Sequence, residues 1–181
     1  MNISKSILKK QVKHASSDKT KPAIMGILID GNRSVATDGY RLSIIDYKVG
    51  CDSKLFIPSD LIEMILKVKF TKKQVNSCND LNYINIEGDI LTFYNGIGFE
   101  QTKTKLKPAS NYPDYEQVIP KELERKNETV CLNVQMLGEL IADDDNRVKF
   151  DFYGELNPVV ARSTIEGLTV TNVLMPIRIR K

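Results

Sequence analysis

The residues of this chain that could carry out catalysis are few and widely spaced. His14 is the only histidine, so a site built from several histidines is excluded and a histidine-based triad would depend on one residue. His14 ends a predicted helix, where the helix dipole favours a cation, and we expect it to have a structural or solvent-facing role. The adjacent carboxylates Asp143–Asp145 do not converge on one point, so they indicate a solvated helix end rather than a metal site.

The cysteines and the short motifs add no further chemistry. Cys51, Cys78 and Cys131 are odd in number and far apart, which is typical of reduced thiols in a cytosolic protein and not of a disulfide framework or a zinc site. The sequence contains no P-loop, no glycine-rich dinucleotide-binding loop and no Gly-x-Ser-x-Gly motif. We therefore predict that the chain is not an enzyme and that it uses no cofactor and no metal.

Lysines form a more informative pattern. Lys5, Lys9 and Lys13 recur every four residues, on the side of a predicted helix opposite Ile3 and Ile7. An ammonium group on a flexible stem suits contact with nucleic-acid phosphates regardless of base sequence. The net charge of +3 proves little by itself, and lysines also cover ordinary exposed helix faces. The candidate phosphate-contacting residues are Lys5, Lys9, Lys10, Lys13, Lys69, Lys72 and Lys73.

The composition predicts a soluble protein with a packed core. A length of 181 residues and a hydrophobic content of 41% correspond to one large domain or one and a half small ones. No run of about 18 apolar residues could span a membrane. The start, Met1–Lys5, lacks the basic and apolar pattern of a signal peptide, so we expect a cytoplasmic protein.

The elements that must position these residues repeat along the chain. Short apolar strands at 55–57 and 130–132 each run into a helix, whose apolar residues (61, 62, 65, 66 and 136, 137, 140, 141) form one buried face. Alternating segments follow, as in antiparallel strands with one buried face. The N-terminal part has the same order, with an apolar strand at 23–29. We predict an α+β fold with helices in one layer and strands in another. The three units are residues 1–49, 54–107 and 128–181, and a linker at 108–127 joins the last two.

Three distant segments carry the most specific signal. They are Val35–Ser43 (VATDGYRLS), Tyr112–Pro120 (YPDYEQVIP) and Val173–Ile179 (VLMPIRI). In this order they resemble segments of the bacterial sliding clamp, the β subunit of DNA polymerase III. The resemblance implies a DNA-clamp fold without an active site, which encircles duplex DNA and holds polymerases by a short peptide. It also implies that units one and two correspond to the family's middle domain and unit three to the second half of its last domain, as in a shortened member.

The resemblance also places a peptide-binding pocket on these segments. In the family, this pocket accepts a short, largely apolar peptide carried by polymerases, the clamp loader and repair factors. Tyr40 stands where a histidine is usual and Gln117 where an arginine is common, which leaves the peptide preference open. Leu174 and Met175 could instead be ordinary core residues of a strand. The matching positions are Ile24, Thr37, Gly39, Tyr40, Arg41, Leu42, Pro113, Val118, Val173, Leu174, Met175, Pro176 and Ile177.

Two functions follow from the resemblance. The first is a homo-oligomeric processivity clamp that binds duplex DNA without sequence preference and docks DNA polymerase and clamp-loader peptides. The second is an adaptor that keeps the pocket but never encircles DNA. Clamp helices line the hole that holds DNA, which favours phosphate contact by the lysines, whereas Glu139 and Asp143–Asp145 make the third helix acidic. Family rings contain twelve such units, so four copies would match, and two copies in an open arc are the alternative. We expect a bacterial protein, or one of a phage or mobile element in a bacterial cell.

Overall fold

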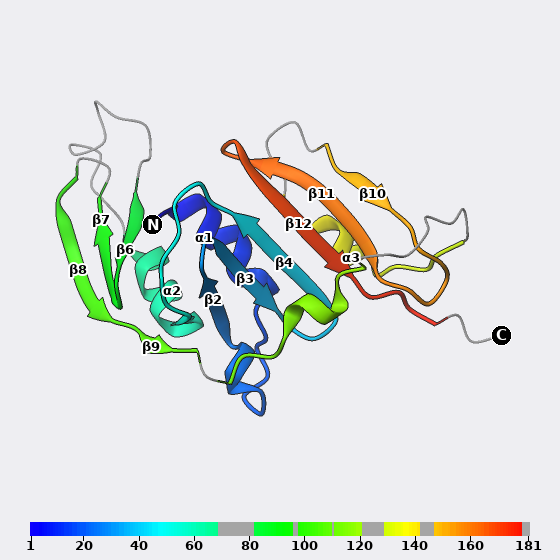
Figure 1. The fold of residues 1–181 in the computed structure, drawn as a ribbon, viewed down its shortest axis with the longest axis horizontal. Helices are drawn as coiled ribbons and strands as arrows, with labels where there is room; N and C mark the ends of the chain where they lie inside the picture. The colour runs from blue at the N-terminus through cyan, green and yellow to red at the C-terminus, as the bar shows by residue number, and fades with distance from the viewer. Residues whose placement is uncertain (69–81, 96–97, 110, 121–128, 142–146, 179–181) are drawn as a thin grey trace.

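The structure, a computed structural model, describes residues 1–68, 82–95, 98–109, 111–120, 129–141 and 147–178. The predicted order of one helix followed by three strands is present three times along the chain (Figure 1). The predicted α+β class is therefore confirmed. No helix among the described residues is long and apolar enough to cross a membrane.

Two of the described α-helices begin directly after a residue whose side chain caps the first helical turn. The Ser4 hydroxyl accepts a hydrogen bond from the Ile7 amide at 3.1 Å, and the Asn133 side chain accepts one from the Gln135 amide at 2.9 Å. Each cap satisfies an amide that the first helical turn leaves unpaired. Unit one contains β1 (Asn2–Ser4), α1 (Lys5–Gln11), the 3-10 turns η1 (Val12–His14) and η2 (Pro22–Ile24), β2 (Gly26–Asp30), β3 (Arg33–Thr37) and β4 (Arg41–Asp46).

The other two units follow the same plan. Unit two contains β5 (Leu55–Pro58), α2 (Ser59–Lys67), β6 (Tyr83–Glu87), β7 (Ile90–Tyr94), β8 (Glu100–Lys105) and β9 (Lys107–Pro108). The linker carries the 3-10 turn η4 (Tyr115–Val118), and unit three contains α3 (Val134–Gly138), β10 (Lys149–Asp151), β11 (Val159–Ile165) and β12 (Leu168–Leu174).

The strands form two antiparallel sheets that run across the unit boundaries. One sheet has four strands in the order β1-β6-β7-β8, and the other has eight in the order β10-β11-β12-β4-β3-β2-β5-β9. Units one and two exchange their first strands, because β1 pairs with β6 and β5 pairs with β2. Unit three joins unit one through β12 and β4, with Val173 opposite Leu42.

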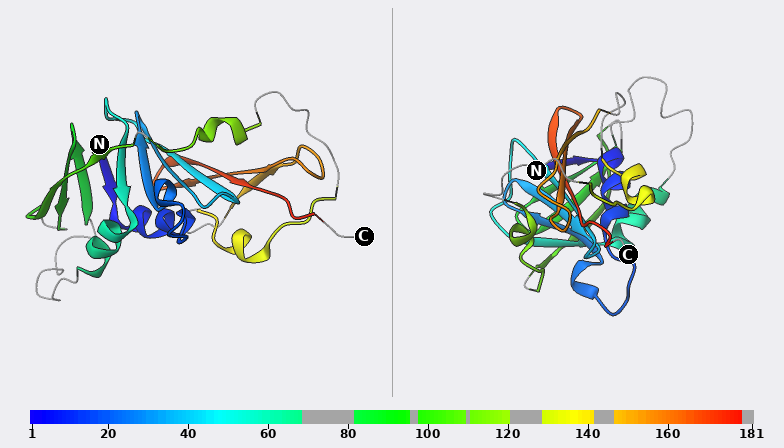
Figure 2. Two further views of the ribbon diagram at one scale, coloured as in Figure 1. Left: turned by 90° about the horizontal axis from the view of Figure 1, so that it is seen from below. Right: turned by 90° about the vertical axis from the view of Figure 1, so that its right-hand side faces the viewer.

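Helices and strands occupy separate layers, as predicted. Figure 2 shows α1, α2 and α3 on the same side of the sheets. The larger core, which takes buried residues such as Ile7, Ile62 and Ile165 from all three units, packs helices against strands. A smaller core on the opposite face of the eight-stranded sheet packs the linker residues Tyr112 and Tyr115 against that sheet.

Four local predictions were wrong. Ile3, which was predicted to lie on the first helix, belongs to β1, because the helix begins only after the Ser4 cap. The strand predicted at 23–29 starts only at Gly26, because Pro22, whose ring fixes φ, begins a 3-10 turn. The third helix, predicted to include residues 140 and 141, ends at Gly138, a residue that disfavours helix continuation. The strand predicted at 130–132 is absent, since no described strand lies beside it to form a ladder.

Candidate functional site

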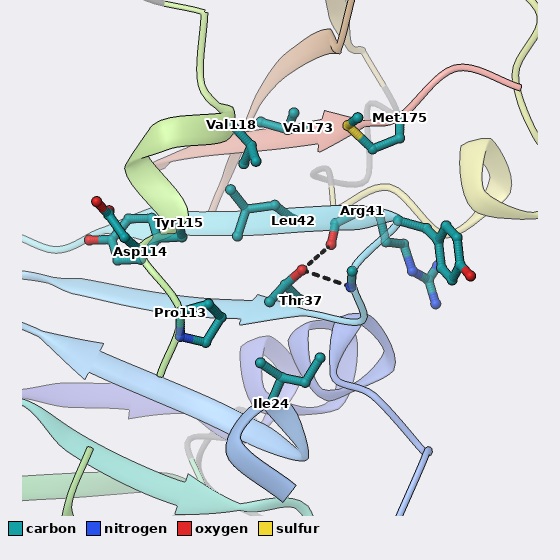
Figure 3. Close-up of a pocket in the computed structure, with 12 residues that line it drawn as sticks. Ile24, Thr37, Arg41, Leu42, Pro113, Asp114, Tyr115, Val118, Val173 and Met175 are labelled. Carbon is teal, nitrogen blue, oxygen red and sulfur yellow. Dashed lines mark hydrogen bonds between the residues drawn. The ribbon is translucent and has the colours of Figure 1, made fainter. Parts of the chain in front are cut away.

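Three distant segments meet around one open, largely apolar cleft. It has a volume of about 170 Å³ and lies over the junction between β4 and β12 (Figure 3). Figure 3 shows Leu42 at its centre, with Val118 and Val173 on one side and Pro113 and Ile24 on the other. The lining residues are Ile24, Thr37, Gly39, Tyr40, Arg41, Leu42, Pro113, Asp114, Tyr115, Val118, Val173 and Met175.

The first wall is the tight turn between β3 and β4. The Thr37 hydroxyl donates to the Arg41 carbonyl at 2.6 Å and accepts from the Gly39 amide at 3.1 Å (Figure 3). The Asp38 carboxylate accepts from the Tyr40 amide at 2.9 Å. Gly39 has a φ of 96°, which residues with a Cβ rarely adopt. The sequence Thr-Asp-Gly therefore fixes the shape of this wall without relying on packing.

Arg41 is engaged by its own chain. Its guanidinium lies away from Leu42, the centre of the cleft (Figure 3). It donates to Asp38 at 2.9 Å and to the Lys13 carbonyl at 2.6 Å, and it forms an ion pair with Glu139. These contacts connect the turn to unit one and to unit three. Arg41 thus stabilises the wall, and the hydrogen bond from Arg41 keeps the pKa of Glu139 below its usual value.

The second wall comes from the linker. Asp114 caps η4 by accepting from the Glu116 amide at 3.1 Å, and this turn places Val118 over the cleft. The Tyr115 hydroxyl donates to Asp30 at 3.2 Å, while burial raises the pKa of that hydroxyl. We did not predict Asp114 and Tyr115 as lining residues, although both lie between Pro113 and Val118, which we did.

The third wall is the end of β12. Val173 and Met175 line the cleft, but Leu174, Pro176 and Ile177 do not. Leu174 is buried on the other face, because successive side chains of a strand point to opposite sides. Pro176 and Ile177 follow the end of the strand. The prediction for these three residues was therefore wrong as to their position.

The lysines that recur every four residues, Lys5, Lys9 and Lys13, are only partly available to an external ligand. Lys9 and Lys13 are exposed on the helix layer and Lys10 is half-buried. Lys5 is half-buried, and its ammonium donates to the Val68 carbonyl at 2.8 Å, tying α1 to the end of α2. The other candidates, Lys69, Lys72 and Lys73, lie outside the described residues, as do Asp143–Asp145 and Cys78.

His14 is buried and uncharged rather than a cation at a helix end. Its side chain is fully buried, and burial together with the neighbouring Arg41 charge lowers its pKa from 6.5 to about 4. The helix-dipole argument failed because desolvation outweighs the dipole at this site. Among the described residues, no group of three or more histidine, cysteine or acidic side chains could hold a metal ion.

Comparisons with known proteins find likeness in structure but not in sequence. No known protein family and no curated protein matches the sequence. The β sliding clamp of C. crescentus matches over 99% of this chain and 65% of its own, with a TM-score of 0.65 and 14% identity. The H. pylori β clamp in complex with diflunisal matches over 95% and 63%, with a TM-score of 0.67 and 15% identity.

A third structure extends the comparison. The sliding clamp of Bartonella birtlesii bound to griselimycin has a TM-score of 0.57 and 19% identity, over 99% of this chain and 66% of its own. This chain thus spans less than two thirds of the length of the clamps it matches. These matching structures are all sliding clamps. The fold of this chain is that of the bacterial DNA polymerase III β sliding clamp.

Proposed function

We propose that this protein is a sliding-clamp-like processivity factor of DNA replication. It would hold duplex DNA without sequence preference and dock DNA polymerase and clamp-loader peptides in the cleft. The observation that carries the proposal is the cleft itself. Its walls come from three segments that are distant in sequence, and they converge on Leu42 in a clamp fold.

The cleft suits a short peptide with apolar anchors. Leu42 and Val173 form an apolar floor that is almost fully buried, while Val118 and Met175 are 41% and 38% exposed at the rim. Each leucine or phenylalanine that enters such a cleft gains about 1.5–3 kcal/mol from burial. Three such anchors contribute roughly 4.5–9 kcal/mol, so after the cost of association we expect an affinity no tighter than roughly micromolar, about −8 kcal/mol.

Calorimetric titration with a clamp-binding peptide carrying leucine and phenylalanine tests this assignment. Val118→Asp places a charge at the apolar rim and should abolish binding without unfolding the protein, because Val118 is half exposed. The matched control is Val49→Asp, which changes a more exposed valine (68% against 41% for Val118) beyond the other end of β4. Failure of the parent to bind, or equal binding by both variants, would leave only a likeness of fold.

A protein-interaction adaptor is the second candidate. It is favoured by the engagement of Lys5 with the Val68 carbonyl, which leaves fewer lysines for phosphate. Retention of the protein on a closed circular duplex, compared with a linear duplex, distinguishes the two functions. A clamp stays on the circle and slides off the open ends, whereas an adaptor binds peptide and stays on neither.

A further inference from the structure

Units one and two complete each other by a reciprocal exchange of strands. β1 of unit one pairs with β6 of unit two, placing Ile3 opposite Ile84. β5 of unit two pairs with β2 of unit one, placing Ile57 opposite Ile27. All four isoleucines are fully buried. In each case the strand that precedes the helix of one unit pairs with the strand that follows the helix of the other unit.

The two exchanges share one register. The residue that caps the helix, Ser4 or Pro58, lies opposite the first residue of the receiving strand, Tyr83 or Gly26. The preceding residue supplies the buried apolar pair. This regularity predicts the partner of any unit that follows the same plan.

In unit three, neither the segment before the helix nor the first strand after it takes part in such an exchange within the described residues. We call these two parts the donating segment and the receiving strand. Its receiving strand, β10, is the last strand of the eight-stranded sheet, and only β11 pairs with it. Phe150 on this strand is half-buried and its ring stacks on Phe152, with 6.2 Å between the ring centroids. Phe152 is 37% exposed. The sheet therefore ends in an aromatic pair where the other units have buried isoleucines.

The donating segment of unit three is also in place. Residues 129–133 precede the helix but form no strand. The Cys131 carbonyl accepts a hydrogen bond from the Ile177 amide at 2.8 Å, just as β5 pairs on one side with β9, the segment that follows the last strand of its own unit. The other side of β5 pairs with unit one, and the matching side of residues 129–133 has no described strand beside it.

The third helix shows the same incompleteness. α1 and α2 pack against each other and bury Ile7 and Ile62. The corresponding residues of α3, Met136 and Leu137, are only half-buried, and no residue of α3 is buried. Val134, at the start of this helix, is 81% exposed.

We propose that unit three binds unit three of a second copy of this chain, around a two-fold axis. Each copy adds residues 131–133 to the edge of β10 that no described strand covers in the other, and the two α3 helices pack together. The register of the internal exchange places Asn133 opposite Lys149, Leu132 opposite Phe150 and Cys131 opposite Asp151. The approximate symmetry that relates units one and two thus becomes a true two-fold symmetry.

A second copy fits better than an unrelated strand. The exchange is reciprocal, so one contact covers both β10 edges and both donating segments, as in any isologous interface. A foreign strand would cover β10 alone and add nothing to the side of residues 129–133 that faces away from Ile177. An exposed edge strand is a template for further pairing, and the closed dimer removes two such edges. If the proposed clamp function holds, this dimer supplies six of the units of a ring.

Cysteine cross-linking tests the register. The native cysteines are first replaced by serine, and Leu132→Cys is then combined with Phe150→Cys. Residues directly opposite in antiparallel strands have Cα atoms about 4.5–5.5 Å apart, within the roughly 4.4–6.8 Å that a disulfide allows. Mild oxidation should give a covalent dimer. Leu132→Cys with Lys149→Cys is the control, because Lys149 points to the opposite face. Equal yields from both pairs, or a disulfide within one chain, would overturn the proposal.

Sedimentation equilibrium tests the contact without cross-links. The parent should be at least a dimer, and Phe150→Glu and Leu132→Asp should each lower its mass at least two-fold, while circular dichroism stays the same. The matched edge variant is Thr102→Glu on β8, the last strand of the other sheet. A monomeric parent at high micromolar concentration would refute the interface. The interface would also be refuted if the Thr102→Glu variant lost association while the Phe150→Glu variant kept it.

Peptide binding separates this proposal from the previous one. The cleft is lined by residues of a single chain, so Phe150→Glu should bind the clamp peptide as tightly as the parent. Normal peptide binding by a monomeric parent would reject the dimer alone. A dimer that binds no peptide would reject the proposed function alone.

Discussion

Mild acid should destabilise this protein through its single buried histidine. His14 has a pKa of about 4 in the folded protein, compared with 6.5 in an exposed position. Between these values the unfolded chain binds a proton that the folded protein does not. Stability is therefore fully retained above about pH 6.5 and falls as the pH decreases toward 4.

The two pKa values give the size of the effect. Their difference, 6.5 − 4, corresponds to about 3 kcal/mol of stability once the pH is below both values. Integration from about pH 7.5 to about pH 5 gives a loss of about 2 kcal/mol. Because His14 is the only histidine of the chain, this loss belongs to one group.

Urea unfolding at the two pH values, in the parent and in His14→Gln, measures this loss. Glutamine does not titrate, and the other ionisable groups contribute equally to both proteins, so the difference in pH dependence isolates His14. The parent should lose about 2 kcal/mol more than the variant between about pH 7.5 and 5. The absolute stability of the variant does not enter the comparison. An equal loss in both proteins would show that the folded protein already protonates His14 at pH 5.

Other perturbations test the site and the helix layer. Arg41→Met removes a guanidinium that is 11% exposed and has three partners, so it should cost roughly 2–3 kcal/mol in thermal or urea unfolding; an unchanged midpoint would contradict its structural role. Met175→Ala shrinks the rim of the cleft and should weaken peptide binding by calorimetry roughly five-fold, about 1 kcal/mol, with unfolding unaffected. Lys9→Glu combined with Lys13→Glu should weaken duplex binding and reduce the salt slope by about two, whereas parental binding would make these lysines a solvated helix face.

The repeated helix-and-strand order was predicted from local patterns, whereas the cleft residues were predicted from the resemblance to sliding clamps. Alternating segments such as 148–152 and helical apolar spacing report burial on one face, and that determines the layers. The side chains of the Thr37–Leu42 turn hydrogen-bond to their own backbone, so the shape of this turn is also set locally. Local rules of this kind survive folding, since they do not depend on distant partners.

The failures involve residues whose environment comes from elsewhere in the chain. Two of the three partners of Arg41 come from η1 and from unit three, more than ninety residues away in the case of Glu139, and no local pattern indicates these two. The neutral state of His14 depends on packing from several elements. The fate of residues 130–132 depends on whether another strand lies alongside, which a sequence pattern of apolar residues cannot specify.

The pairing of β12 with β4 couples occupancy of the cleft to the integrity of the fold. A peptide that touches Leu42, Val118 and Met175 at once binds only while unit three and the linker remain docked on unit one. Ligand at a hundred times its dissociation constant would therefore add about 2.7 kcal/mol against undocking. By the same linkage, any undocked population of the free protein would weaken the measured affinity in proportion. A loosely docked third unit would thus cost binding energy, because the peptide would have to supply the free energy of docking as well.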